Sequence, residues 1–68
     1  MLDVKKLKAK MVLADHTQAS LATATGMSKT AVHDKVNGKR PLNCDEVDRI
    51  CAALGITDPV EKVEIFLA

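Results

Sequence analysis

The apolar positions at the start of the chain have the spacing of an amphipathic helix. Four of them, separated by three or four residues, share one face of a helix predicted over residues 2–14. They are Val4, Leu7, Met11 and Ala14. Four lysines fall mostly on the other side: Lys5, Lys6, Lys8 and Lys10. This segment is therefore expected to bury one face and to expose a basic one.

A second helix is predicted to begin at Thr17, whose hydroxyl can accept a hydrogen bond from a free N–H group of the first turn. Its buried positions are expected to be Leu21, Ala22 and Ala24. Gly26 ends this helix, because glycine tolerates the left-handed conformation of a sharp turn.

A third helix follows at once. Met27 is expected to link it to the second helix by entering the core, and Ser28 is its predicted cap. Val32 and Val36 lie one turn apart and form the predicted inner face. The Asn37-Gly38 pair ends the helix.

Two more helices are predicted in the second half of the chain. Asn43, with Glu46 three residues later, forms a variant of the capping box, and Gly55 closes the helix. The apolar positions of this fourth helix repeat at the helical period: Val47, Ile50, Cys51 and Leu54.

The last helix is predicted from Asp58-Pro59, because proline suits the first helical position, and Glu61 is expected to complete the cap. Its buried side is predicted to consist of Val60, Val63, Phe66 and Leu67. Ile65 then falls on the opposite side. Its surplus apolar surface predicts either a weak homodimer contact near the C-terminus or a terminus that folds back over the core.

Length and composition place these elements in one small domain, residues 1–68. Such a chain is near the size at which a single core becomes marginal, and it has no room for a buried catalytic cleft beside a scaffold. Aliphatic residues and methionine supply the apolar content, and Phe66 is the one aromatic residue. The expected fold class is all-α, a compact bundle of four to five helices, and an enzyme is not expected.

The formal net charge of +1 conceals an asymmetry along the chain. Residues 1–42 carry eight cations against three anions, or +5, whereas residues 43–68 carry two cations against six anions, or −4. A basic N-terminal part suits a polyanion such as nucleic acid, and the acidic part would keep that surface one-sided. Two solvated faces without a partner explain the charge alone equally well.

Other classes of protein and site have little support in the sequence. Lysines interrupt every early apolar run, so no targeting signal is expected, and no apolar run approaches the roughly 20 residues of a membrane span. A soluble, cytoplasmic protein without a membrane partner is predicted. Cys44, Cys51, His16 and His33 lack the paired spacing of a zinc site. No metal or other cofactor is therefore expected, and both thiols are interpreted as buried or half-buried structural groups.

Residues 17–37 have the organisation of a helix-turn-helix. Two short helices joined by a tight glycine turn, and packed through small residues, hold the second helix out to enter a DNA major groove. If Val32 and Val36 point inward, other side chains of that helix face outward. These are Lys29, Thr30, His33 and, at the edge, Asp34. Such side chains can reach base edges or phosphates.

At these residues the sequence resembles the Cro and lambda-repressor-like, or XRE, helix-turn-helix regulators. The likeness covers the chain from about Leu7 onward. It is carried by Thr17-Gln18, Leu21-Ala22, Gly26-Met27-Ser28, Val32, Asn37-Gly38-Lys39-Arg40-Pro41 and Ile50-Cys51-Ala52-Ala53-Leu54-Gly55-Ile56. The first helix and the tail are especially similar to short phage- or prophage-encoded members. The resemblance implies a third helix that reads DNA and a dimer on the operator.

The resemblance also implies DNA-binding residues. Gln18 matches a glutamine that contacts a phosphate and braces the recognition helix. The base-reading positions match Lys29, Thr30 and His33. Asn37, Lys39 and Arg40 match contacts to the DNA backbone, and Thr17 and Ser28 complete the candidate set. A structural interpretation stands beside each role: a helix cap for Ser28, and a solvated surface residue for Gln18, His33, Lys39 or Arg40.

Three departures from the family pattern concern His16, Ala19-Ser20 and Lys35. His16 stands where an apolar residue is usual. Ala19-Ser20 replaces an acidic pair, so that the second helix lacks a capping glutamate. Lys35 occupies a position at which many members bury an aliphatic residue, which leaves the register of the inner face open.

Two classes of function follow from the sequence. The first is a sequence-specific, double-stranded DNA-binding transcriptional regulator, in particular a phage- or prophage-type repressor that binds a palindromic operator as a homodimer. The second is an antitoxin-like or other protein-interaction module that uses the same bundle and an unknown protein partner. A small enzyme is remote, because neither histidine has a nucleophile at a suggestive spacing.

Overall fold

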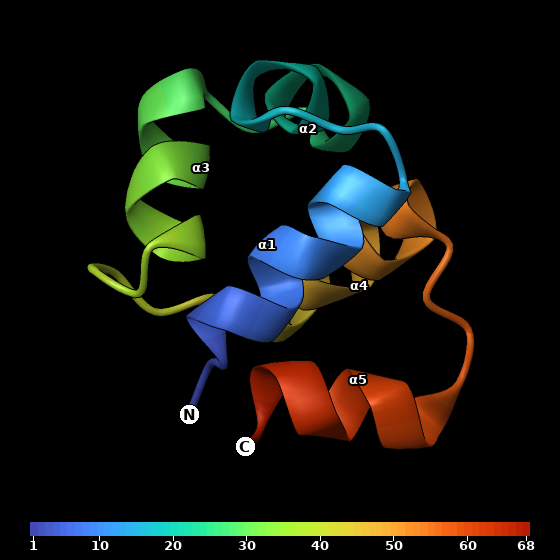
Figure 1. Cartoon of the computed structure of the whole chain (residues 1–68). Helices are drawn as coiled ribbons and strands as arrows, with labels where there is room; N and C mark the ends of the chain where they lie inside the picture. The colour runs from blue at the N-terminus through green and yellow to red at the C-terminus, as the bar shows by residue number, and fades with distance from the viewer.

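The computed structural model describes all 68 residues, as five α-helices and no strand. The helices are α1 (Val4–Leu13), α2 (Gln18–Thr25), α3 (Lys29–Val36), α4 (Cys44–Leu54) and α5 (Pro59–Phe66). In Figure 1, α1 lies in front of α4 in the middle of the molecule, α2 and α3 lie above and beside them, and α5 runs below α1. The prediction of an all-α fold is confirmed, and α1 is shorter than expected. No helix is long and apolar enough to cross a membrane.

All five helices contribute to one hydrophobic core of 12 buried residues. Its fully buried side chains are Leu7, Leu21, Ile50, Val32 and Val36. The predicted inner faces of α1, α3 and α4 are therefore confirmed, with Val4, Ala14 and Val47 only half-buried. Met27, between α2 and α3, is also half-buried and packs against the core.

The predicted helix ends are confirmed in α2, α3 and α4. Thr17 and Ser28 each accept a hydrogen bond from the backbone N–H three residues later, at 3.1 Å. Asn43 and Glu46 form the expected capping box. Ser20 supplies the reciprocal bond that the sequence appeared to lack, because its hydroxyl accepts from the Thr17 N–H at 2.9 Å.

The buried face of α5 differs from the prediction. Ile65 is only 3% exposed and packs in the core with Phe66, whereas the expected core residues Val60, Val63 and Leu67 are exposed. The N-terminal segment lies against this end of α5. The Asp3 N–H donates to the Ile65 carbonyl at 2.7 Å, which joins the start of α1 to the end of α5. The prediction that Ile65 supplies surplus surface is therefore wrong.

Three smaller predictions are also wrong. Ala24 is exposed, and the buried residue at the end of α2 is Thr25, whose hydroxyl donates to the Leu21 carbonyl at 2.7 Å. Cys44 is exposed, although Cys51 is buried as expected. Glu61 pairs with Lys10 at 3.0 Å, while Asp58 caps α5 through the Val60 N–H.

Gly26 provides a test of the turn between α2 and α3. Its φ angle is +73°, in the left-handed region, and open space surrounds the position of an added Cβ. Gly26→Val should therefore lower the free energy of unfolding by about 1–2 kcal/mol through backbone strain alone. Gly26→Asn is the matched control, because asparagine tolerates this conformation better. Urea unfolding measures the free energy of unfolding of both variants. An equal decrease in the two would contradict backbone strain as the cause.

Candidate nucleic-acid interface

The orientation of α3 determines which side chains form the candidate interface. Val32 and Val36 lie one turn apart and are fully buried, so the opposite side of α3 faces solvent. Lys29, Thr30 and His33 are exposed, as predicted. Asp34 is half-buried on the same helix. The structure therefore presents the three predicted base-reading residues on one accessible helix.

The contact between α2 and α3 is stabilised at the turn and from α4. Thr25 is buried, and its hydroxyl bond to its own helix satisfies its polar group. The Arg49 guanidinium, on α4, reaches the Thr25 carbonyl at 3.4 Å. The sequence pattern did not indicate this contact, because Arg49 lies 24 residues away from Thr25.

A partly buried ion pair shows where Lys35 lies. Its ammonium contacts the Glu46 carboxylate, and the two side chains are only 12% and 13% exposed. The Asn43 backbone N–H and then the Lys35 ammonium hold the pKa of Glu46 below its ordinary value. Lys35 thus faces α4 as a paired cation, while Val36 occupies the core.

The structure brings Gln18 and His33 together, although they are 15 residues apart. The His33 Nδ1 lies 3.1 Å from the Gln18 Oε1. Thr17 and Ser28 are exposed, and the hydroxyl oxygen of each already accepts a backbone N–H within its own cap. The N-terminal ends of α2 and α3 thus carry polar side chains whose positions are fixed by hydrogen bonds.

The segment after α3 contains the remaining predicted residues. The Asn37 amide donates to the His33 carbonyl at 2.7 Å and so closes the end of α3. Lys39 is exposed and has no ion-pair partner. The Arg40 guanidinium lies 3.9 Å from the Asp34 carboxylate, a pairing that sequence spacing alone did not suggest. The positive charge of Arg40 therefore offsets the negative charge of Asp34, the one acidic residue of α3.

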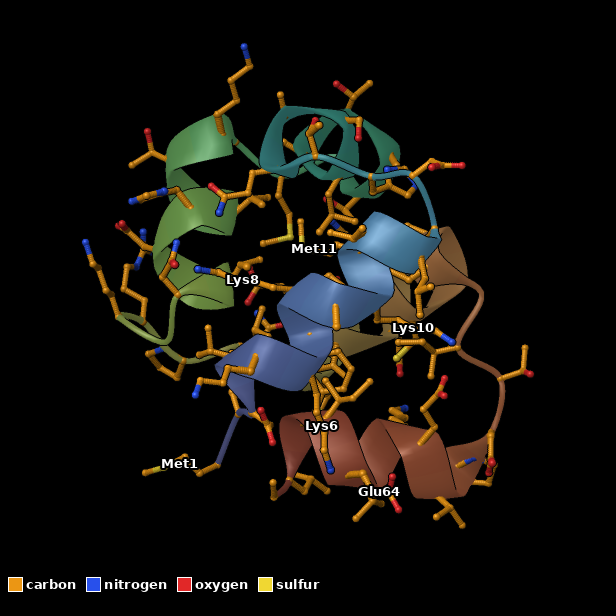
Figure 2. The ribbon with its side chains drawn as sticks, viewed as in Figure 1. Met1, Lys6, Lys8, Lys10, Met11 and Glu64 are labelled. Carbon is orange, nitrogen blue, oxygen red and sulfur yellow. The ribbon has the colours of Figure 1, made fainter.

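The lysines of α1 do not form one surface with α3. Lys8 lies on the side of α1 that is next to α3, whereas Lys6 extends towards α5 (Figure 2). Lys10 pairs with Glu61 of α5. The basic N-terminal part is thus divided between two sides of the molecule.

No group of three or more histidine, cysteine or acidic side chains could hold a metal ion. Both cysteines are free, and burial raises the pKa of the Cys51 thiol. His16 bonds to Ser20 at 2.9 Å, which gives this unusual polar residue a local structural partner.

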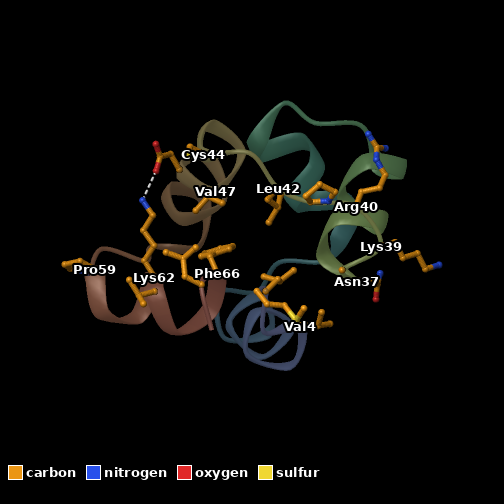
Figure 3. Close-up of a pocket in the computed structure, with 17 residues that line it drawn as sticks. Val4, Asn37, Lys39, Arg40, Leu42, Cys44, Val47, Pro59, Lys62 and Phe66 are labelled. Atoms are coloured by element: carbon orange, nitrogen blue, oxygen red, sulfur yellow. Dashed lines mark hydrogen bonds and ion pairs between the residues drawn. The ribbon is translucent and has the colours of Figure 1, made fainter.

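A second surface lies next to this interface. An apolar groove of about 930 Å³ runs between the N-terminal segment, residues 37–42, α4 and α5. Val4, Leu42, Val47 and Phe66 lie in its middle, while Lys39 points away from it (Figure 3). The exposed side chains of Met1, Val63 and Leu67 also line this apolar groove.

The five helices and the exposed α3 define a helix-turn-helix DNA-binding domain. The family model described as a Cro/C1-type HTH DNA-binding domain matches residues 6–61, and the chain belongs to this family. No curated protein and no solved structure matches the sequence significantly.

The Lys35–Glu46 pair makes stability depend on pH. Because the pKa of Glu46 is lower in the folded chain, its ionised form stabilises the fold above about pH 4.5, and this contribution is lost as the pH falls through the folded pKa. Glu46→Gln keeps an acceptor for the Asn43 N–H and removes the charge. We expect a lower free energy of unfolding at pH 7 and a difference from wild type that shrinks in acid.

Urea unfolding across this pH range measures the effect. Asp45→Asn is the matched control, since the Asp45–Arg49 pair is largely exposed and should contribute little. If Glu46→Gln lowered the free energy of unfolding equally at every pH, the ionised Glu46 carboxylate would not be the source of the stabilisation.

Proposed function

We propose that the protein is a sequence-specific transcriptional regulator, a phage- or prophage-type repressor that binds a palindromic operator in the cytoplasm. The single observation that carries this proposal is the orientation of α3. Two fully buried valines fix its inner face, and Lys29, Thr30 and His33 remain exposed. A helix presented in this way fits the major groove, where lysine suits guanine acceptors and the threonine methyl suits thymine.

The flanking residues would hold the helix in register on the DNA backbone. Lys39 and Arg40 follow α3, and Thr17, Gln18, Ser28 and Asn37 lie at helix ends. Helix N-termini favour phosphates through their free N–H groups. Of the two cations, Lys39 is expected to contribute more to phosphate binding, because the charge of Arg40 is partly offset by the Asp34 carboxylate.

Two classes of substitution test this division of roles. Lys29→Ala and Thr30→Ala should each reduce the preference for the operator over random DNA, by about 1–3 kcal/mol per lost contact. Lys39→Ala should weaken binding to all sequences alike and lower the slope of log affinity against log salt by about 1 per subunit. Lys6→Ala, on the α5 side of α1, is the control for loss of a distant lysine.

Mobility-shift titrations at several salt concentrations measure these effects, using sites selected by the protein from random duplexes. An unchanged ratio of operator to random affinity in both α3 variants would refute α3 as the recognition helix.

We also propose that the protein binds as a homodimer through the apolar groove. Val60, Val63 and Leu67 are exposed and recur at a spacing of three and four residues, and the last two of them line this groove. Met1 adds a fourth exposed apolar side chain, since its amino group bonds to the Ala68 carbonyl at 2.8 Å. An exposed apolar surface of this kind suits a self-complementary two-fold contact. Residues 37–42 border the groove, so the two copies of α3 would lie on either side of this contact.

Leu67→Glu tests the dimer. Leu67 is 70% exposed, so the substitution should leave the monomer folded while it weakens both self-association and operator binding. Val12→Glu introduces the same charge at a residue that is 74% exposed on α1 and is the matched control. Sedimentation and operator titration report the two effects. Wild-type behaviour of Leu67→Glu in both measurements would refute the proposed interface.

An antitoxin-like interaction module is the second candidate function, because the same apolar groove could receive a different protein. The selection from random duplexes separates the two candidates. A regulator should enrich a palindromic site, whereas a module that acts only on a protein partner should enrich none.

A further inference from the structure

The hydrogen bond between Gln18 and His33 couples the tautomer of His33 to the orientation of the Gln18 amide. The amide oxygen of glutamine can only accept a hydrogen bond, and here it faces Nδ1 at 3.1 Å. With the amide oxygen on this side, Nδ1 is the donor. A neutral imidazole has a single N–H group, so the second nitrogen, Nε2, has a free lone pair.

This assignment gives His33 an acceptor that Lys29, the exposed cation of α3, lacks. The Lys29 ammonium is a donor only, and it suits the acceptor atoms of guanine. An acceptor on the same helix instead suits the amino groups of the major groove, which are N6 of adenine and N4 of cytosine.

We propose that Gln18 holds His33 in the tautomer protonated at Nδ1, so that His33 Nε2 selects a base by accepting a hydrogen bond from its exocyclic amino group. This inference rests on the proposed function. In it His33 reads the base, and Gln18 is a positioning residue that acts through His33. The remaining N–H donors of the Gln18 amide are left for a phosphate.

The test begins with sites that the full chain selects from random duplexes at pH 8, where histidine side chains are ordinarily neutral. His33→Ala identifies the base pair that His33 reads, as the position at which this variant loses discrimination. Two atomic changes are then made separately at that position. One removes the amino group, with purine in place of adenine or a 4-deaminated analogue in place of cytosine, and the other removes N7 with a 7-deaza purine.

Removal of the amino group should lower the affinity of the wild-type protein by about 2- to 10-fold, the range of one net hydrogen bond. The same removal should not affect His33→Ala, and the 7-deaza change should not affect the wild type through His33. In Gln18→Ala the penalty for amino removal should shrink towards that of His33→Ala, because either nitrogen can then carry the proton. The base preference at the position read by Thr30 should persist, which a general structural role for Gln18 would not predict.

Three results would overturn the inference. They are a wild-type penalty for loss of N7 with none for loss of the amino group, a His33→Ala variant that keeps every base preference, or a Gln18→Ala variant that keeps the full amino penalty. If the protein selects no preferred site at all, the proposed function itself fails and this inference fails with it.

Discussion

The burial of Val32 and Val36 is the constraint on which the rest of the structure depends. Both side chains have no exposed surface, and they are joined in the core by Leu7, Leu21 and Ile50. A helix of eight residues has little stability of its own, so packing must hold α3 in place. Without these two valines in the core, the rotation of α3 about its axis would no longer be fixed. Lys29, Thr30 and His33 would then no longer be held on the outer side.

Polar contacts then fix α3 more closely than apolar packing alone can. The Lys35–Glu46 pair ties α3 to α4, and Glu46 is also half of the capping box that starts α4. One carboxylate therefore serves two elements. The Gln18–His33 bond ties α3 to α2 on the exposed side. α2 and α4 thus each contribute to α3 one directed contact that apolar surfaces, which lack direction, would not supply.

Local signals in the sequence were sufficient to predict those helix ends that a single type of residue determines. Glycine at Gly26 and Gly55, and a short polar side chain at Thr17, Ser28 and Asn43, correctly predicted the ends of α2, α3 and α4. The candidate base-reading residues followed from the helical period once Val32 and Val36 were taken as buried. These exposures agree with the prediction, whereas the DNA contacts themselves stay predictions.

The same reasoning was insufficient for α5, where apolar residues occupy several sides of one helix. Periodicity cannot choose between a face with Val63 and Leu67 and a face with Ile65, and the tertiary packing that buries Ile65 is not encoded in the spacing along α5. Two contacts between side chains or between a side chain and the backbone could not be predicted from the sequence either. Arg40 with Asp34 and Arg49 with Thr25 depend on where loops and helices meet, which no local spacing encodes.

The ion pairs also explain how a nearly neutral chain can present a basic surface. Five cations are paired with acids: Lys10, Lys35, Arg40, Arg49 and Lys62. At a distance such pairs act as weak dipoles, so the field on an approaching polyanion comes chiefly from the cations without partners. The unpaired cations are Lys5, Lys6, Lys8, Lys29 and Lys39. All of them precede residue 40, and Lys29 and Lys39 stand at opposite ends of α3. Two of the five unpaired cations therefore flank the helix whose outer face carries Thr30 and His33, and the other three lie on α1.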